Sequence, residues 1–326
     1  MRPIPLLILL TLLLIFISFW SIAVGSVHIS LMELWQIMLG QGEPMLRAVV
    51  LELRLPRVLS ALAVGGMLAL AGTQLQVLLG NPLADPYILG ISGGSAVMAL
   101  LAIMVGLGGM AVGGSAFAGA LLSMVLVFGL AHGKGNWSPT RLLLTGVVIA
   151  AGWGALISFL LSVAPQQHLR SMLFWLMGDL QHAATPWAGL LVLALGLMLS
   201  MPLARSLNLL ARGEMQAASL GVDVKRLRLQ LYLLASLLTA TAVTIGGSIG
   251  FVGLIIPHLM RLLVGSDHRL LLPAASLAGA TLLVLADTLA RTMLAPQQLP
   301  VGVLTALLGV PVVLFLLQRN ASGKSL

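Results

Sequence analysis

The chain has 326 residues, of which 59% are hydrophobic and only 8% are charged, and its net charge is +8. Because a soluble domain normally carries about 25% charged residues, this composition excludes a water-soluble protein and indicates a single polytopic membrane domain over residues 1–326. We interpret the basic excess as membrane topology rather than nucleic-acid binding, since Lys and Arg between apolar spans concentrate in cytoplasmic loops. The chain has no Cys, which excludes disulfides and thiol chemistry.

The first apolar segment covers residues 4–24 and carries no charge. A signal peptide has a shorter apolar core, about 7–15 residues, followed by a small-residue cleavage site. No clean site of that kind follows this segment. We therefore predict a first membrane helix here, with a signal peptide as the alternative.

Uncharged windows along the chain predict ten membrane helices, because about 20 apolar residues are needed to cross a bilayer. The window 87–131 is divided at its glycines between 106 and 114, and the window 229–260 at Gly246–Gly250. The predicted helices are 4–24, 57–80, 87–106, 111–131, 140–163, 186–205, 226–246, 251–264, 270–293 and 301–318. An even number places both termini on one side, and a cytoplasmic position puts most of the Lys and Arg residues inside. The predicted fold is all-α.

Pairs of glycines four positions apart recur in these helices. Small residues at this spacing let membrane helices approach closely, so we predict a compact bundle. The pairs are Gly90 and Gly94, Gly109 and Gly113, and Gly246 and Gly250.

An ion-coupled carrier needs ionisable groups near the middle of the membrane. Asp287 is the one carboxylate clearly within a predicted span, and Arg291, four residues later, is its expected partner on the same helix face. His258 is interpreted as a structural histidine at a helix end. The other histidines show no metal-ligand spacing, so no metal site is predicted.

The sequence offers no nucleotide site or catalytic cluster of its own. The "SGKS" near the C-terminus lacks the first glycine of a phosphate loop, and "ISGGS" at 91–95 opens an apolar helix, so both are chance matches. No Ser-His-Asp, Cys-His or paired-carboxylate arrangement is present. We therefore expect coupling energy to come from another subunit, and we predict neither enzyme activity nor a cofactor bound by this chain.

The polar segment 211–226, "ARGEMQAASLGVDVKR", stands out against the apolar chain. Glu214 suits the first turn of a short helix, because the helix dipole favours an acid there. Gly221 suits a C-terminal cap with positive φ, and Asp223 can cap the next membrane helix. The segment predicts a short cytoplasmic helix over 211–220, which could be an ordinary connector or could receive force from a cytoplasmic motor.

Five segments resemble the FecCD family of ABC importer permeases, which take up iron chelates, haem and cobalamin. The first is "LRLPRVLSALAVGGMLALAGTQLQVLLGNPLADPYILGISGGSA" at 53–96, and the others lie at 141–146, 212–224, 250–291 and 299–317. The resemblance implies a type II ABC importer permease in the bacterial inner membrane. It also implies a homodimer served by two cytoplasmic ATPase subunits, which hold ATP and Mg, and by a periplasmic binding protein.

The same resemblance implies roles for three sets of residues. The coupling helix, at about 211–221, would use Arg212, Gly213, Glu214, Ala217, Ala218, Leu220 and Gly221. The periplasmic docking pocket for acidic side chains would use Arg54, Arg57 and Arg291. The cytoplasmic gate would use Asn81, Leu83, Pro139 and Thr140, although Pro139 departs from the small polar residue expected there.

The resemblance favours an iron chelate, a ferric siderophore, as cargo, with cobalamin or haem as alternatives. Two other classes stay open: an ion-coupled secondary carrier and a membrane enzyme. Asp179, in "WLMGDL", departs from the family pattern, and we place it at the periplasmic mouth without assigning it a role.

Overall fold

The computed structural model describes residues 3–25, 29–131, 138–181, 186–295 and 297–321 of the chain. Within these residues it is helical and contains no strand. Seven helices are long and apolar enough to cross a membrane, and three shorter helices are also apolar. The prediction of an all-α polytopic protein with about ten apolar helices is confirmed.

Each of the ten apolar helices overlaps a predicted range. α5 begins at Ile91 rather than at residue 87, because Pro86–Leu89 forms a separate 3-10 turn, η2, that ends at Gly90 with a φ of 71°. The bounds are α1 Pro3–Ala23, α4 Leu55–Leu79, α5 Ile91–Met104, α6 Gly109–Ala131, α7 Pro139–Val163, α9 Pro186–Ser200, α12 Val224–Gly246, α13 Val252–Val264, α14 His268–Thr292 and α15 Val301–Ala321.

The sequence analysis missed several short elements because none is an apolar run long enough to cross a membrane. α2 (Leu31–Met38) follows α1, and α8 (Gln166–Met177) follows α7. α3 (Pro44–Ala48) and the π-helical η1 (Val49–Arg54) extend α4 into one 36-residue span, Pro44–Leu79. Between α9 and α12 lie η3 (Met201–Leu203) and α10 (Ala204–Leu210), followed by α11 (Glu214–Ser219), the short helix that was predicted over 211–220.

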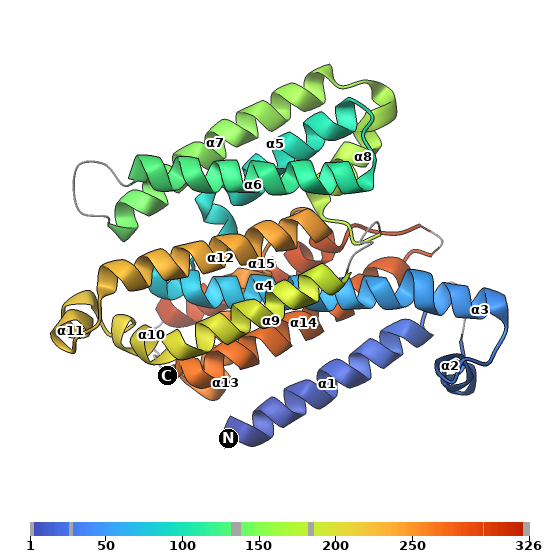
Figure 1. Ribbon diagram of the computed structural model, residues 1–326, viewed down its shortest axis with the longest axis horizontal. Helices are drawn as coiled ribbons and strands as arrows, with labels where there is room; N and C mark the ends of the chain where they lie inside the picture. The colour runs from blue at the N-terminus through green and yellow to red at the C-terminus, as the bar shows by residue number, and fades with distance from the viewer. Residues whose placement is uncertain (1–2, 26–28, 132–137, 182–185, 296, 322–326) are drawn as a thin grey trace.

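α4 is the centre of the bundle, and most of its span is buried. It contacts α9, α12, α13 and α14, while α5, α6, α7 and α8 form a second group beside it (Figure 1). Glycine makes the closest approaches possible: a Cβ on Gly72 would collide with the carbonyl oxygen of Gly253, and one on Gly65 with that of Gly279. Close packing of small residues is how membrane helices gain contact where lipid supplies no hydrophobic drive.

The glycine pairs predicted from sequence contribute unevenly to this packing. Gly94 packs tightly on Gly119 of α6, as predicted. Gly109 faces open space, since a Cβ placed there would meet no heavy atom within 4 Å, so the packing prediction is wrong at that residue. Close approach therefore depends on what lies opposite a glycine, which a spacing pattern does not contain.

The bundle has two distinct ends (Figure 1). One carries α11, and we call it the α11 end. The other carries α2, α3 and α8, and we call it the α8 end. α1 begins toward the α11 end, and ten apolar helices bring the chain back to the side from which it started.

Candidate functional site

α11 is a short helix bounded by two glycines. Gly213 precedes it with a φ of 130°, and Gly221 follows it with a φ of 83°. The predicted positive φ at Gly221 is confirmed, as is the position of Glu214 in the first turn. Asp223 caps α12 by accepting a hydrogen bond from the Arg226 N–H at 3.0 Å, which is also confirmed. The two glycines make α11 shorter than the predicted helix over 211–220.

α11 turns nearly all of its side chains outward. Ala217 is its one buried residue, whereas Ala218 is exposed. Met215 is 86% exposed and Leu220, directly after the helix, is 66% exposed. Such large apolar side chains on a projecting helix at the end of the bundle are a feature of surfaces that bind a partner.

α11 is fixed to the transmembrane helix α12 by an ion pair. Nη1 and Nη2 of Arg228 lie 3.0 and 2.8 Å from the two carboxylate oxygens of Glu214, a bidentate geometry that restrains both partners. Arg228 is buried, while the Glu214 side chain is 57% exposed. The two residues are 14 positions apart and belong to different helices, so the spacing of residues along a single helix does not predict their contact. The sequence analysis therefore did not assign Arg228 to the coupling site.

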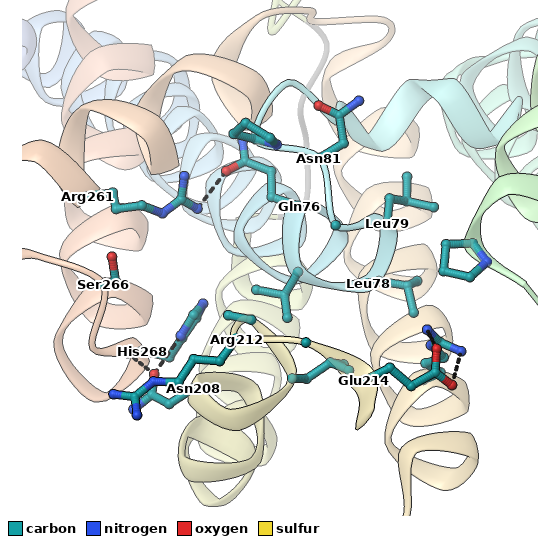
Figure 2. A pocket seen from close by; sticks show the side chains of 18 of the residues that line it. Gln76, Leu78, Leu79, Asn81, Asn208, Arg212, Glu214, Arg261, Ser266 and His268 are labelled. Atoms are coloured by element: carbon teal, nitrogen blue, oxygen red, sulfur yellow. Dashed lines mark hydrogen bonds and ion pairs between the residues drawn. The ribbon is translucent and has the colours of Figure 1, made fainter. Parts of the chain in front are cut away.

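A pocket of about 780 Å³ lies directly behind α11 (Figure 2). Its wall includes Asn81 and Pro82 after α4, Pro139 at the start of α7, and Arg212 and Glu214 beside α11. The two predicted gate loops thus meet at one cavity next to the predicted coupling helix. Leu83 and Thr140, the other two predicted gate residues, are not among its lining residues.

Local geometry explains the residues of the gate loops. Gly80 ends α4 in a left-handed conformation, and the Asn81 N–H donates to Gln76 O at 3.1 Å. Asn81 therefore caps the helix with its backbone, while its side chain accepts from the Leu83 N–H at 2.9 Å. Pro139 is the first residue of α7, a position that favours proline because its missing N–H has no helical acceptor.

Hydrogen bonds hold the opposite wall of the pocket. Arg261 of α13 donates to the Gln76 side chain of α4 at 2.9 Å. Asn208 of α10 donates to Asp267 at 2.8 Å and accepts from the His268 backbone N–H at 2.8 Å. The Asn208 hydrogen bond lowers the pKa of Asp267 below its usual value. The wall thus ties α4, α10, α13 and α14 together beside α11.

The α8 end contains a cluster around Asp287, whose side chain is 1% exposed. Arg57 of α4 approaches it with Nε 2.9 and 3.1 Å from the two carboxylate oxygens, and Arg291 lies at 3.4 Å. The predicted pair within α14 is confirmed, but Arg57, 230 positions away, is the closer partner. Nη1 of Arg57 also donates to Gln298 at 2.8 Å.

The three arginines predicted for docking lie at the same end of the bundle, and two of them, Arg54 and Arg291, also bind the end of α1. Arg54 donates to the carbonyls of Ile22 and Ala23 at 2.7 and 3.0 Å, and Arg291 donates to that of Ser21 at 2.6 Å. The carbonyls at a helix C-terminus carry partial negative charge and favour cations. The side chains of Arg57 and Arg291 are only 11% and 9% exposed, so little of this charge reaches the surface.

The structure gives the positions of His258 and Asp179, two further residues interpreted from the sequence. His258 lies in the middle of α13 rather than at a helix end, so that placement was wrong. Asp179 lies at the α8 end, where its carboxylate accepts from the Gln181 N–H at 2.8 Å and its own N–H donates to Gly246 O. Among the described residues, no group of three or more His, Cys, Asp or Glu side chains could hold a metal ion.

Comparison with known proteins places the chain in a family. The model of the FecCD transport family matches residues 12–319. The hemin transport system permease protein of Yersinia pestis is 41% identical, with 97% of this chain and 96% of that protein covered. The Fe(3+) dicitrate transport system permease protein FecD of Escherichia coli is 42% identical over 83% of this chain and 85% of its own.

A solved inward-facing structure of a metal-chelate type ABC transporter has the same fold. It superposes with a TM-score of 0.84 at 35% identity and covers 98% of this chain and 100% of the other. The predicted resemblance and the type II importer architecture are confirmed. The chain is a multi-pass membrane protein that belongs to the FecCD transport family, the permeases of ABC importers for metal chelates.

Proposed function

We propose that the chain is the single transmembrane permease domain, residues 1–326, of an ATP-driven importer that carries a ferric siderophore from the periplasm to the cytoplasm. It works as a homodimer in the bacterial inner membrane, with both termini in the cytoplasm. Two cytoplasmic ATPase subunits bind ATP and Mg, and a periplasmic binding protein delivers the cargo. The chain itself catalyses no reaction and holds no cofactor.

The observation that carries this proposal is the construction of α11. α11 exposes every side chain except that of Ala217, and the ion pair between Glu214 and Arg228 fixes it to α12. These two properties suit a helix that binds another protein and transmits its movement. An ATPase that closes on ATP would push α11, and the bidentate pair would pass the movement to α12. The proposed ATPase-binding surface consists of Arg212, Gly213, Ala218, Leu220 and Gly221. Ala217 packs the helix against the bundle.

The proposed gate residues lie next to α11, where its movement would reach them. Asn81 and Pro139 line the pocket behind α11, together with Arg212 and Glu214. Leu83 and Thr140 extend the two gate loops from there. A displacement of α11 therefore reaches both loops through a shared wall, without a relay of distant residues.

The docking surface lies at the α8 end, around Arg54, Arg57 and Arg291. Arginine presents a rigid fork that suits a carboxylate, and the cluster holds three arginines for one internal acid. An acidic side chain of the binding protein is the group that this excess of positive charge fits. Arg57, with 11% of its side chain exposed against 9% for Arg291, is the slightly more accessible of the two arginines that bind Asp287.

An iron chelate is the proposed cargo because the hemin and the Fe(3+) dicitrate permeases both match most of this chain. Cobalamin is the second candidate, since the motifs of the family are shared by cobalamin permeases. An ion-coupled carrier is disfavoured because Asp287, the one carboxylate clearly within a predicted span, is bound by two arginines.

Uptake into liposomes tests the proposal. The permease is reconstituted with its ATPase and binding protein, and uptake of a ferric siderophore, haem and cobalamin is compared at equal concentrations. We expect ATP-dependent uptake, highest for the ferric siderophore. Uptake of cobalamin alone would contradict the proposed cargo. Uphill uptake by the isolated chain in a proton or sodium gradient would contradict the whole proposal.

A further inference from the structure

α2 is a defined helix in the connection between α1 and α3. It begins with a capping box: the Ser30 N–H and hydroxyl each donate to Glu33 Oε2 at 2.7 Å, and the Glu33 N–H donates to the Ser30 hydroxyl at 3.2 Å. Gly40 and Gly42, with φ of 79° and 116°, turn the chain after it. Because both ends of α2 are fixed, the same side chains point toward the bundle and the same side chains point away from it.

Large apolar side chains occur on both faces of α2, and the exposed face carries Gln36 among them. Leu34 and Ile37 are 5% and 3% exposed and pack into the core of the bundle. On the other side Met32 and Trp35 are 68% and 59% exposed, and Leu39, directly after the helix, is 59% exposed. A helix on a water-facing surface shows one apolar stripe and a polar opposite face, so something other than water covers this second face.

The surroundings of α2 indicate what covers it. α2 lies at the α8 end, in the connection between α1 and α3, and α3 begins the apolar span Pro44–Leu79 (Figure 1). Two other tryptophans are exposed at the same end: Trp20 in the last turns of α1 is 38% exposed, and Trp187 at the start of α9 is 71% exposed. Tryptophan concentrates where a membrane meets water, because its ring has an apolar body and a polar N–H.

The exposed face of α2 also continues into surface that faces lipid. Met45 of α3 is 68% exposed, and Leu53 of η1 is 65% exposed. Both belong to the apolar span that runs on into α4. Large exposed apolar side chains therefore occur on α2, α3 and η1 alike, interspersed with exposed polar residues such as Gln36, Arg47 and Glu52.

We propose that α2 lies flat in the membrane–water interface, with Met32, Trp35 and Leu39 inserted among the lipid headgroups and upper acyl chains. Helices of this kind bury their apolar face about 5–10 Å into that boundary. Between residues 29 and 42 the chain has Glu33 and no Lys or Arg. Insertion therefore depends on apolar burial and not on attraction to anionic lipid.

This inference goes beyond the proposed function and stands independently of it, since it requires only a bilayer around the bundle. The competing occupant is a soluble partner that docks at the α8 end. The exposed face of α2 lacks the basic groups that the arginine cluster offers to an acidic partner. Lipid is therefore the occupant that matches its chemistry.

Site-directed spin labelling tests the position of α2, and a chain without Cys suits the method. Trp35→Cys and, as an independent second variant, Met32→Cys are labelled with a nitroxide in nanodiscs of phosphatidylcholine. Phe16→Cys on α1, where the side chain is 68% exposed, is the lipid-facing control. Gln41→Cys, beyond α2, is the water-facing control. Collisions with apolar oxygen and with a water-soluble nickel chelate are measured for each label.

We expect the labels at 35 and 32 to collide preferentially with oxygen, like the label at 16, at a depth of about 5–10 Å below the headgroups. The depth should stay the same in high salt and when part of the lipid is anionic. Labels at 35 and 32 that match the label at 41 would overturn the proposal. Protection from nickel only after a binding protein is added would likewise overturn it and identify a docking surface.

Discussion

The two ends of the bundle use their charged residues in opposite ways. At the α11 end, Glu214 is 57% exposed although it binds Arg228, and nearly every side chain of α11 reaches outward. At the α8 end, Asp287 is 1% exposed and is enclosed by Arg57 and Arg291. One end exposes its carboxylate to solvent, and the other buries its carboxylate among its own helices.

The difference shows that a cluster of charged residues in a sequence does not by itself mark a contact surface. The segment 212–228 and the arginines at 54, 57 and 291 both stand out in an apolar chain. Only the first set is presented on a projecting helix, while the second joins α1, α4 and α14. A buried charge is held by its internal partner, and removing that partner leaves an uncompensated charge.

Asp287→Asn should give the largest effect, because it removes the shared partner of two buried arginines. Breaking a buried pair from one side costs about 3–5 kcal/mol. The matched change at the other end is Glu214→Gln, which removes the 57% exposed partner of the buried Arg228 and should cost less, about 1 kcal/mol, because water reaches this pair from the Glu214 side. Unfolding in detergent, followed by circular dichroism against denaturant, measures both.

The comparison between the two ends depends on the difference in unfolding free energy between Asp287→Asn and Glu214→Gln. Asp287→Leu with Arg57→Met and Arg291→Met serves as a control, because replacing all three charged members of the cluster by apolar residues leaves no uncompensated charge there. It should recover part of the loss. Equal stability of Asp287→Asn and Glu214→Gln would mean that the α8 end is no more dependent on its ion pairs than α11 is.

Ala218→Trp should separate ATP hydrolysis from transport, because Ala218 lies on the exposed side of α11 where an ATPase would fit. Overpacking a fitted contact costs about 1–3 kcal/mol, so the uptake rate should fall about tenfold or more. Ala218→Ser, which keeps a small side chain, should transport normally. Uptake per ATP hydrolysed in liposomes is the measurement, and full uptake by the Trp variant would contradict the coupling role of α11.

The local chemistry of these sites could be predicted, but their tertiary partners could not. Glu214, Gly221 and Asp223 were placed correctly, because first-turn acids, positive-φ glycines and N-caps depend on a few neighbouring residues. The partners Arg228 and Arg57 were missed, since they lie 14 and 230 positions from the carboxylates that they bind. Contacts between helices follow from packing, which one sequence does not record.

The same limit applies to the fold. The ten apolar helices were found from hydropathy, because the bilayer imposes a minimum length on each span. α2, α3 and α8 were missed, because short helices outside the apolar spans depend on caps and neighbours rather than on length. The capping box at Ser30 and Glu33 was the available signal for α2.

Arg57→Gln tests whether the arginine cluster at the α8 end contributes to docking of the binding protein. If Arg57 contacts an acidic side chain of the binding protein, affinity for the permease in nanodiscs should fall about tenfold, equal to about 1.4 kcal/mol, and should depend less on salt. Arg57→Lys keeps the charge and should lose less. Surface plasmon resonance gives both affinities, and an unchanged affinity at low salt would assign the cluster to structure alone.

Ser30→Ala should have the smallest effect, confined to the start of α2 at the α8 end. The capping serine donates to and accepts from Glu33, and loss of an N-cap side chain costs about 1 kcal/mol. The amides of α2 should then exchange with deuterium about five times faster, while those of α11 stay unchanged. Val24→Ala, before the helix, is the control. Equal exchange in α2 with and without the cap would mean that the lipid face, rather than the capping box, holds this helix in place.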